Sequence, residues 1–269
     1  TGQTVNQVQL TDNLPALHIN DFIIDDQGFI GWVKGIDGSN LTIRDLHQEP
    51  MLHQECWGLR PRDIFQALAM YALMDPDIHL VNLTGAAGSG KTILALAAAI
   101  EQTMVTKTYR RIIATRSTQG LDEDIGFLPG TEKEKMEPWL GAITDNLEAL
   151  HMDDESTHGS VEYILDRVPL QFKSLNYIRG RSFQQSFILI DESQNLTPHQ
   201  IKTIITRAGN GSKVICLGNL AQIDTPYLNA TSSGLTYLTE CFKDFPHGVH
   251  IHLQGVPRSA LAEYAETHL

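Results

Sequence analysis

The sequence has few cysteines and no long hydrophobic run. Cys56, Cys216 and Cys241 lie far apart and lack the paired spacing of a metal or redox motif, so we expect reduced thiols and no disulfide framework. No apolar stretch reaches the roughly 18 to 20 residues that cross a bilayer, and the first residues show no signal-peptide pattern. These absences predict a cytoplasmic protein without a membrane partner.

Positive charge is also scarce. The chain has 20 Lys and Arg against 32 Asp and Glu, for a formal net charge of −12. This balance argues against a generally basic surface for nucleic acid, so any such binding must use local patches. The best local clusters are Arg179 with Arg181, and Arg110 and Arg111 with Arg116.

The length of 269 residues suits one large domain with a small appendage. Residues 1–21 are polar and aperiodic, which indicates a linker or extended arm. From residue 22 to residue 46, short β-prone runs alternate with Asp and Gly, a pattern that predicts hairpins too short to fold alone. We therefore expect a linker and β-rich segment over residues 1–54 and a main domain over residues 55–269.

The main domain alternates strand-like and helix-like segments, which predicts a mainly parallel α/β sheet with helices on both faces. We expect strands before Gly85 and at 110–115, 187–190, 213–217 and 249–253. We expect helices at 59–74, 93–100, 136–150, 198–208 and 259–268. Thr197 is the expected N-cap of the 198–208 helix, and Gln200 completes a capping box.

Residues 80–92 contain a phosphate-loop pattern. Gly85, Gly90, Lys91 and Thr92 fit G-x-x-x-x-G-K-[ST], between an apolar strand-like run and an alanine-rich helix. The alternative is a glycine-rich turn that matches by chance. The lysine and threonine in register and the helix behind them favour a nucleotide-binding loop.

The chemistry of phosphate binding explains the residue types. Amides can wrap a phosphate only where the backbone comes close, so Gly85, Gly88 and Gly90 need positive φ and no Cβ. Lys91 offers a cation to the β- and γ-phosphates, and the Thr92 hydroxyl is a ligand for Mg²⁺. The predicted nucleotide-binding set is the whole loop, namely Gly85, Ala86, Ala87, Gly88, Ser89, Gly90, Lys91 and Thr92.

Asp191 and Glu192 come directly after the apolar run at 187–190. An aspartate at such a strand end can hold Mg²⁺ beside Thr92, and the adjacent carboxylate can orient and deprotonate an attacking water. The alternative is an acidic pair that merely ends a strand. The α/β pattern and the upstream phosphate loop favour the catalytic role.

Four further side chains are candidates, each with a simple alternative. Gln222 follows the next strand and is a candidate γ-phosphate sensor, with Asn219 behind it, although both are ordinary turn residues. Gln66 is a candidate contact to the adenine edge or a solvated glutamine. Arg258 is a candidate cation for the transferred phosphoryl group or a surface ion-pair partner. The guanine-reading pattern Asn-Lys-x-Asp is absent, which favours ATP.

Several blocks outside the phosphate loop extend the pattern over about residues 55 to 269. They are Leu59–Gln66, Asp75–Val81, Asp124–Gly130, Glu134–Trp139, Tyr177–Phe183, Asp191–Leu196 and Arg258–Ser259. Together with the loop, they resemble the PhoH-like ATPase family. The family usually has aspartate at Asn219, alanine at Ser193 and proline at Ser117, and the first departure weakens a metal or water role for Asn219.

The resemblance implies a RecA-like phosphate-loop core that is related to superfamily-one helicases and uses ATP and Mg²⁺. It implies that Gln66 contacts adenine, that Gln222 senses the γ-phosphate and that Arg258 is an arginine finger between subunits of a homo-oligomeric ring, such as a hexamer. In many such relatives a PIN ribonuclease domain lies upstream. No acidic run here forms that nuclease, so we expect the chain to be the ATPase half.

The sequence leaves three functions open. The first is an ATP-driven remodeller or helicase-like motor that acts on RNA or another single-stranded nucleic acid; a ring would supply the second core that monomeric helicases carry. The second is a nucleotide-dependent oligomeric scaffold that regulates an attached or partner domain, such as a PIN ribonuclease. The third is a small-molecule kinase, which the acidic loop at residues 120–134 disfavours.

Overall fold

The computed structural model describes residues 5–9, 16–117 and 167–255. The helices predicted at 136–150 and 259–268, the loop at 120–134 and Arg258 lie outside these residues. Within the described ranges, no helix combines the length and the apolar character needed to cross a membrane.

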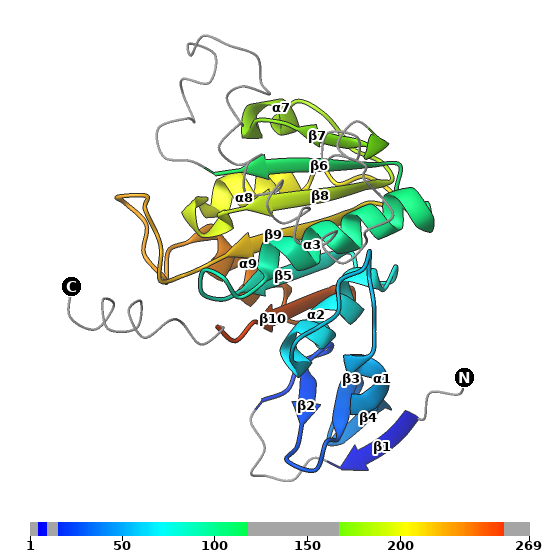
Figure 1. Cartoon of the computed structure of the whole chain (residues 1–269). Helices are drawn as coiled ribbons and strands as arrows, with labels where there is room; N and C mark the ends of the chain where they lie inside the picture. The colour runs from blue at the N-terminus through cyan, green and yellow to red at the C-terminus, as the bar shows by residue number, and fades with distance from the viewer. Residues whose placement is uncertain (1–4, 10–15, 118–166, 256–269) are drawn as a thin grey trace, which may run out of the picture.

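A six-stranded parallel sheet forms the centre of the molecule (Figure 1). In sheet order its strands are β10 (Gly248–His252), β5 (Leu80–Thr84), β9 (Lys213–Gly218), β8 (Ser186–Asp191), β6 (Arg111–Arg116) and β7 (Leu170–Phe172). All neighbouring pairs are parallel. β5 leads into the phosphate loop and β8 ends in Asp191, with β9 between them. This order confirms the predicted RecA-like α/β fold.

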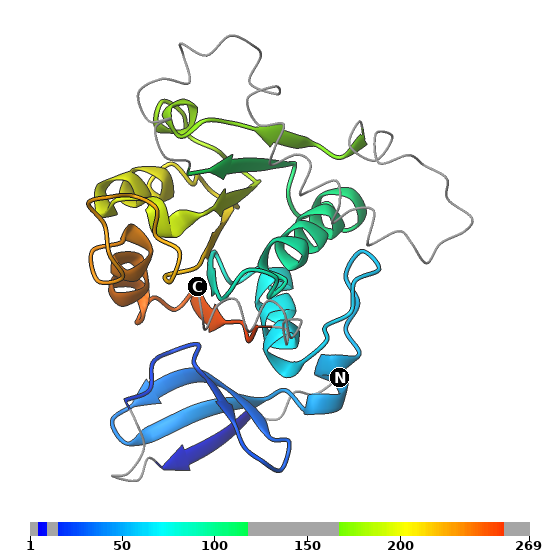
Figure 2. The ribbon, with the colours of Figure 1, turned by 60° about the vertical axis from the view of Figure 1, so that its left-hand side comes forward.

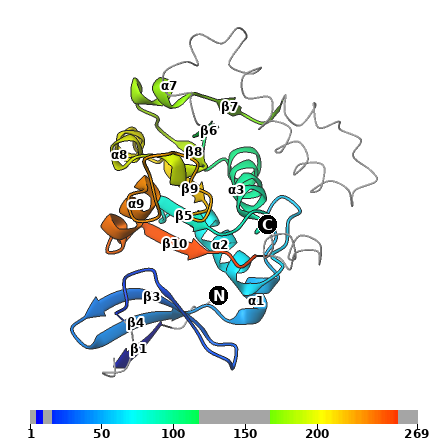
Figure 3. The same cartoon turned by 90° about the vertical axis from the view of Figure 1, so that its left-hand side faces the viewer.

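Helices cover both faces of this sheet (Figure 3). One face carries α2 (Ile64–Met74) and α3 (Lys91–Ile100), which continues into the π-helical turn η1 (Glu101–Val105), and the other carries α7 (Leu175–Arg179), α8 (Pro198–Ile205) and α9 (Gly234–Phe242). Along β8, Phe187 and Leu189 join the first core, whereas Ile188 and Ile190 join the second. Such strands are apolar on both sides because both sides are covered.

A separate four-stranded antiparallel sheet precedes the main domain (Figure 2). Its order is β1 (Val5–Gln9), β4 (Asn40–Asp45), β3 (Ile30–Asp37) and β2 (Phe22–Ile24), and the helix α1 (Gln48–Leu52) follows. The predicted hairpins are therefore present. Residues 1–21 were predicted to form a linker or extended arm, and within them Val5–Gln9 is the strand β1, which pairs with β4.

The small sheet packs against the main domain instead of standing alone. Trp32 is fully buried, and its ring contacts Tyr71 of α2 edge to face at 5.3 Å between centroids. The Trp32 Nε1 donates to Asn20 Oδ1 at 3.0 Å, and the Asn20 Nδ2 donates to the Gly248 carbonyl of β10 at 2.9 Å. A buried tryptophan needs such a partner for its N–H. The junction thereby connects the small sheet to the helix that approaches the phosphate loop.

Helix boundaries follow the capping residues. The expected start of the first long helix at residue 59 was wrong, because α2 begins at Ile64, where Asp63 accepts a hydrogen bond from the Gln66 amide at 2.8 Å. The Thr197 capping box of α8 is confirmed. The patterns above did not predict α7 or α9. α9 begins with glycine and contains threonines, which are weak helix formers.

Candidate functional site

The phosphate loop has the backbone that its glycines were expected to provide. Gly85, Gly88 and Gly90 have φ values of 148°, 76° and 90°, a region that favours glycine. A Cβ on Gly85 would lie 2.7 Å from the Leu253 carbonyl oxygen, and one on Gly90 would lie 2.8 Å from the Gln66 Nε2. Gly88 has open space, so only its φ requires glycine.

Lys91 folds back over the loop. Its Nζ donates to the carbonyl oxygens of Gly85 at 2.6 Å and Ala86 at 2.8 Å, and lies 3.3 Å from the Ser89 Oγ. Burial lowers the pKa of Lys91, while the charges of Asp191 and Glu192 oppose that change. The ammonium group therefore lies at the N-terminus of α3 and electrostatically near both acids, where a phosphate can replace its carbonyl contacts.

The acidic pair lies at the carboxyl end of β8 and meets a cation. Arg116 is the β6 residue in register with Asp191. Its Nη2 donates to Glu192 Oε1 at 3.1 Å, and its Nε lies 3.9 Å from Asp191 Oδ2. Burial raises the pKa of the Asp191 carboxyl to about 6, the Glu192 charge adds to this rise, and Arg116 opposes it. Glu192 has a φ of 52°, an uncommon value for this residue type.

Gln194 connects the acidic pair to the segment after β9. Its fully buried side chain donates from Nε2 to Glu192 Oε2 at 2.6 Å and to the Gln222 carbonyl at 2.9 Å. Its Oε1 accepts from the Asn219 amide at 3.2 Å. This residue was not predicted as part of the site. The available signals were its position two residues after Glu192 and its place in the block Asp191–Leu196.

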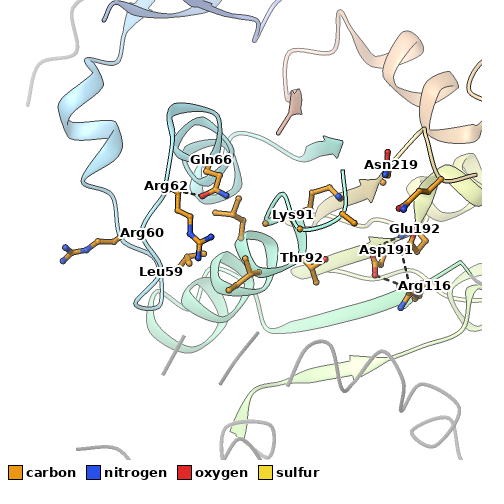
Figure 4. Close-up of a pocket in the computed structure, with 17 residues that line it drawn as sticks. Leu59, Arg60, Arg62, Gln66, Lys91, Thr92, Arg116, Asp191, Glu192 and Asn219 are labelled. Carbon is orange, nitrogen blue, oxygen red and sulfur yellow. Dashed lines mark hydrogen bonds and ion pairs between the residues drawn. The ribbon is translucent and has the colours of Figure 1, made fainter. Parts of the chain in front are cut away.

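A pocket of about 470 Å³ joins these elements (Figure 4). Its lining residues are Leu59, Arg60, Arg62, Gln66, Ala87, Gly88, Gly90, Lys91, Thr92, Ile93, Leu94, Arg116, Asp191, Glu192, Gly218, Asn219 and Gln222. This volume is within the range of small-molecule sites. Gly85, Ala86 and Ser89 were also predicted to bind nucleotide, but they do not line the pocket; each contacts the Lys91 Nζ.

Gln66 lies at the opposite end of the pocket from the acids (Figure 4). Its Oε1 accepts from the Arg62 amide at 2.9 Å, and its Nε2 donates to the Ser89 carbonyl at 3.1 Å. A carboxamide has two N–H groups and two lone pairs on oxygen, so one donor and one acceptor position remain. The two contacts hold the side chain in one orientation beside the loop.

The segment after β9 brings Asn219 and Gln222 to the pocket. The Asn219 Oδ1 accepts from the Ala221 amide at 3.1 Å, which is a local turn contact. Gln222 is exposed and carries its side chain to the pocket wall. Arg258 lies outside the described residues, so its role as an arginine finger stays a prediction.

Arg116 was predicted to belong to a basic cluster with Arg110 and Arg111, and the structure separates them. Arg111 is the first residue of β6 and Arg116 is the last. The two side chains therefore lie at opposite ends of this strand, Arg111 at its amino end and Arg116 at its carboxyl end. A cation at the carboxyl end of a parallel strand was the missed signal, because these ends surround the ligand sites of open α/β sheets.

The residues at the acidic end suit a magnesium ion bound to phosphate. The Thr92 hydroxyl and the Asp191 carboxylate both line the pocket, and Mg²⁺ prefers such oxygen ligands. Among residues 5–9, 16–117 and 167–255, no cluster of three or more His, Cys, Asp or Glu side chains forms a metal cage. A Mg²⁺ ion bound here would complete its shell with phosphate and water.

Comparisons with known proteins match this chain to one family and to several relatives. The PhoH family, described as PhoH-like protein, matches residues 58–267. Protein PhoH2 of Bacillus subtilis (strain 168) is 39% identical over 264 residues, which are 97% of this chain and 59% of that protein. Protein PhoH2 of Mycolicibacterium smegmatis is 35% identical over 210 residues, which are 78% of this chain and 47% of that protein. The chain thus spans about half the length of these curated relatives.

Solved structures with a similar arrangement include two helicases. The Pif1 helicase from Candida albicans is 12% identical, with a TM-score of 0.39, and the match covers 77% of this chain and 43% of that one. The PRRSV helicase is 13% identical, with a TM-score of 0.32, and the match covers 93% and 45%. These likenesses are too distant to indicate function. The family match includes both the phosphate loop and the acidic pair, and the chain belongs to the PhoH family.

Proposed function

We propose that this chain binds ATP with Mg²⁺ and hydrolyses it to ADP and phosphate. One observation supports this function: Lys91, on the loop after β5, and the acidic pair Asp191 and Glu192, on β8, line the same pocket. A cation and amides at a helix N-terminus bind a polyphosphate, and two acids opposite them supply the groups that hydrolysis needs.

Each residue at this end has a distinct role. Lys91 and the loop amides hold the β- and γ-phosphates, while Thr92 and Asp191 hold Mg²⁺, which neutralises charge on the phosphate oxygens. Glu192 accepts a proton from the water whose oxygen attacks the γ-phosphorus. The bond from the γ-phosphorus to the bridging oxygen breaks, and ADP leaves with that electron pair.

The remaining predicted residues read the nucleotide. Gln66 offers its free donor and acceptor to the adenine edge, and Gln222 contacts the γ-phosphate. Arg258, from the same subunit or a neighbour in a ring, stabilises the charge that develops on the transferred phosphoryl group.

Hydrolysis drives the remodelling of RNA or another single-stranded nucleic acid by a homo-oligomer of such cores, with a hexameric ring as the working assembly. The membership of the PhoH family supports a nucleotide-dependent core.

The test measures Mg²⁺-dependent ATP turnover with and without single-stranded RNA, alongside the molar mass in solution. We expect turnover that RNA increases. Lys91→Ala should abolish ATP binding, whereas Glu192→Gln should bind ATP and retain it uncleaved. Normal hydrolysis by Glu192→Gln would remove Glu192 as the base, and turnover that no nucleic acid changes would count against the motor.

One contact path favours the alternative of a nucleotide-dependent scaffold. The small sheet contacts α2 through Trp32 and Tyr71, and Gln66 at the other end of α2 bonds to Ser89 of the phosphate loop. Nucleotide binding at the loop would then act on the segment at residues 1–54 and on a partner domain, such as a PIN ribonuclease, attached to it. Assembly that changes with ATP, without any response to RNA, would support this alternative.

A further inference from the structure

Basic residues are segregated in one part of this acidic chain. Between residues 167 and 207 the sequence has six Lys and Arg residues and only two acids, Asp191 and Glu192. Both acids belong to the nucleotide pocket. This segment, which includes β7, α7 and α8, is therefore basic in sequence, in a protein whose net charge is −12. Such segregation concentrates positive potential on one face.

Aromatic rings order several of these cations. The Lys173 Nζ lies 4.5 Å from the centre of the Tyr177 ring, and the Arg181 guanidinium carbon lies 4.4 Å from it. The adjacent Phe183 ring is 6.4 Å from Tyr177, and the Arg111 guanidinium carbon is 5.7 Å from the Phe183 ring. Cation–π contacts restrict long side chains before a ligand arrives, so less rotamer entropy is lost on binding.

The arginines of this surface remain available to an anion. Within the part of the chain that the structure describes, Arg111, Arg179 and Arg181 form no ion pair with a carboxylate. Arg179 makes a 3.4 Å contact to the Asn176 Oδ1, and Arg181 is exposed. A guanidinium group presents several N–H donors in a fork that matches phosphate oxygens.

We propose that this surface, formed by Arg111, Lys173, Tyr177, Arg179 and Arg181, binds the phosphate backbone of a single-stranded nucleic acid. The inference deepens the proposed function and rests on it for the role of the bound strand in hydrolysis. Cations beside a partly exposed tyrosine ring are typical of single-strand platforms, in which the cations contact phosphates and the ring stacks with a base. An acidic peptide would use the cations but would not need Tyr177.

The surface has a direct structural route to the nucleotide pocket. The Lys173 amide donates to the Ala114 carbonyl of β6 at 2.9 Å. Two residues further along this strand, Arg116 contacts Glu192 at 3.1 Å. A strand bound at Lys173 thus lies next to the β-strand that positions Arg116 beside the proposed base.

The test measures the anisotropy of a labelled single-stranded oligouridylate at several salt concentrations, without nucleotide. We expect Arg179→Ala/Arg181→Ala to weaken binding by at least about tenfold and to lower the salt slope by about 1.4, because each lost phosphate contact to a single strand contributes about 0.7. Tyr177→Leu should weaken binding by about tenfold, whereas Tyr177→Phe should keep it. Lys243→Ala, which removes a cation paired with Glu240 on α9, is the matched control.

Basal ATP turnover distinguishes this inference from the proposed function. The arginine double variant should hydrolyse ATP at the wild-type rate without RNA and should lose only the stimulation. Wild-type binding by the double variant, or an unchanged salt slope, would overturn the inference even if ATP hydrolysis is present. Equal competition by polyglutamate would assign the surface to acidic peptides, and tighter binding of a matched duplex would overturn the single-strand assignment.

Discussion

Gln194 donates a 2.6 Å hydrogen bond from Nε2 to the Oε2 of Glu192, and the same Nε2 donates to the carbonyl oxygen of Gln222 at 2.9 Å. Arg116 contacts the other oxygen of Glu192 at 3.1 Å. Both oxygens of the proposed base are therefore held, one by a buried amide and one by a guanidinium. Gln194 thus links the segment after β9 to Glu192 through direct hydrogen bonds.

Gln194→Met tests this positioning role, because methionine keeps the length of the side chain and removes its hydrogen-bonding groups. We expect the kcat for ATP to fall by about 10- to 100-fold, since a misplacement of about 1 Å has effects of this size, while the Kd for ATP changes by less than about twofold. Steady-state turnover and equilibrium nucleotide binding measure the two quantities.

The control for Gln194 is the Glu192→Gln background. Without the base, Gln194→Met should lower the residual turnover little further, because residues that act as a unit are not additive. Gln194→Glu keeps an acceptor for the Asn219 amide but places a like charge against Glu192, and it should also lose kcat. Independent losses in the Glu192→Gln background, or a large loss of ATP affinity, would show that Gln194 only maintains the pocket.

We predict that Arg116 orients Glu192 and does not act only as a nucleotide-binding residue. Arg116→Ala should lower kcat by about 10- to 100-fold because it leaves Glu192 with one donor. Arg116→Lys keeps the charge but loses the planar fork, so we expect an intermediate rate. Single-turnover hydrolysis with saturating ATP gives the chemical rate, and equal rates for the alanine and lysine variants would contradict an effect of charge.

Gly85→Ala should damage the phosphate loop. Alanine at a φ of 148° costs about 1 to 3 kcal/mol, and its Cβ would lie 2.7 Å from the Leu253 carbonyl oxygen. We expect at least about tenfold weaker ATP binding and a lower Tm. Gly38→Ala is the control: it has a φ of 58° and nothing within 4 Å of the added Cβ, so it should cost about 1 kcal/mol of stability and leave ATP affinity unchanged.

From the buried Lys213 we predict that the free energy of unfolding rises with pH. Its buried Nζ donates to the carbonyl oxygens of Ala72, Leu73 and Asp75 at 2.7 to 2.9 Å, near the end of α2. Burial lowers the pKa of Lys213 to about 7, against 10.5 for an ordinary lysine. Between these values the unfolded chain binds more protons than the folded one, so the group adds stability as pH rises, by up to about 1.4 kcal/mol per unit.

The measurement for Lys213 is the free energy of unfolding of the wild type and of Lys213→Met from pH 7 to pH 10. Other groups titrate equally in both proteins, so the difference between them isolates Lys213. We expect this difference to shift in favour of the wild type as pH rises. A difference that does not change with pH would mean that the three carbonyl contacts keep the ammonium charged despite its burial.

Local chemistry along the chain was enough to predict much of the fold and part of the candidate site. The spacing of Gly85, Gly90, Lys91 and Thr92 identified the phosphate loop, and the apolar run before Asp191 identified a buried strand with acids at its end. The start of α8 was predicted from Thr197, because a capping box depends on residues three positions apart. These features depend on residues that are close together in the sequence, so they can be predicted without the tertiary structure.

Only the tertiary structure decided which side chains surround the acids. Arg116 reaches Asp191 because β6 pairs in parallel with β8 at one register, and Gln194 contacts Gln222 because β9 lies beside β8. In the same way, β1 became a strand by pairing with β4. Residues that are distant in sequence meet through strand pairing, and no local pattern around Arg116 or β1 specifies the partner strand or its register.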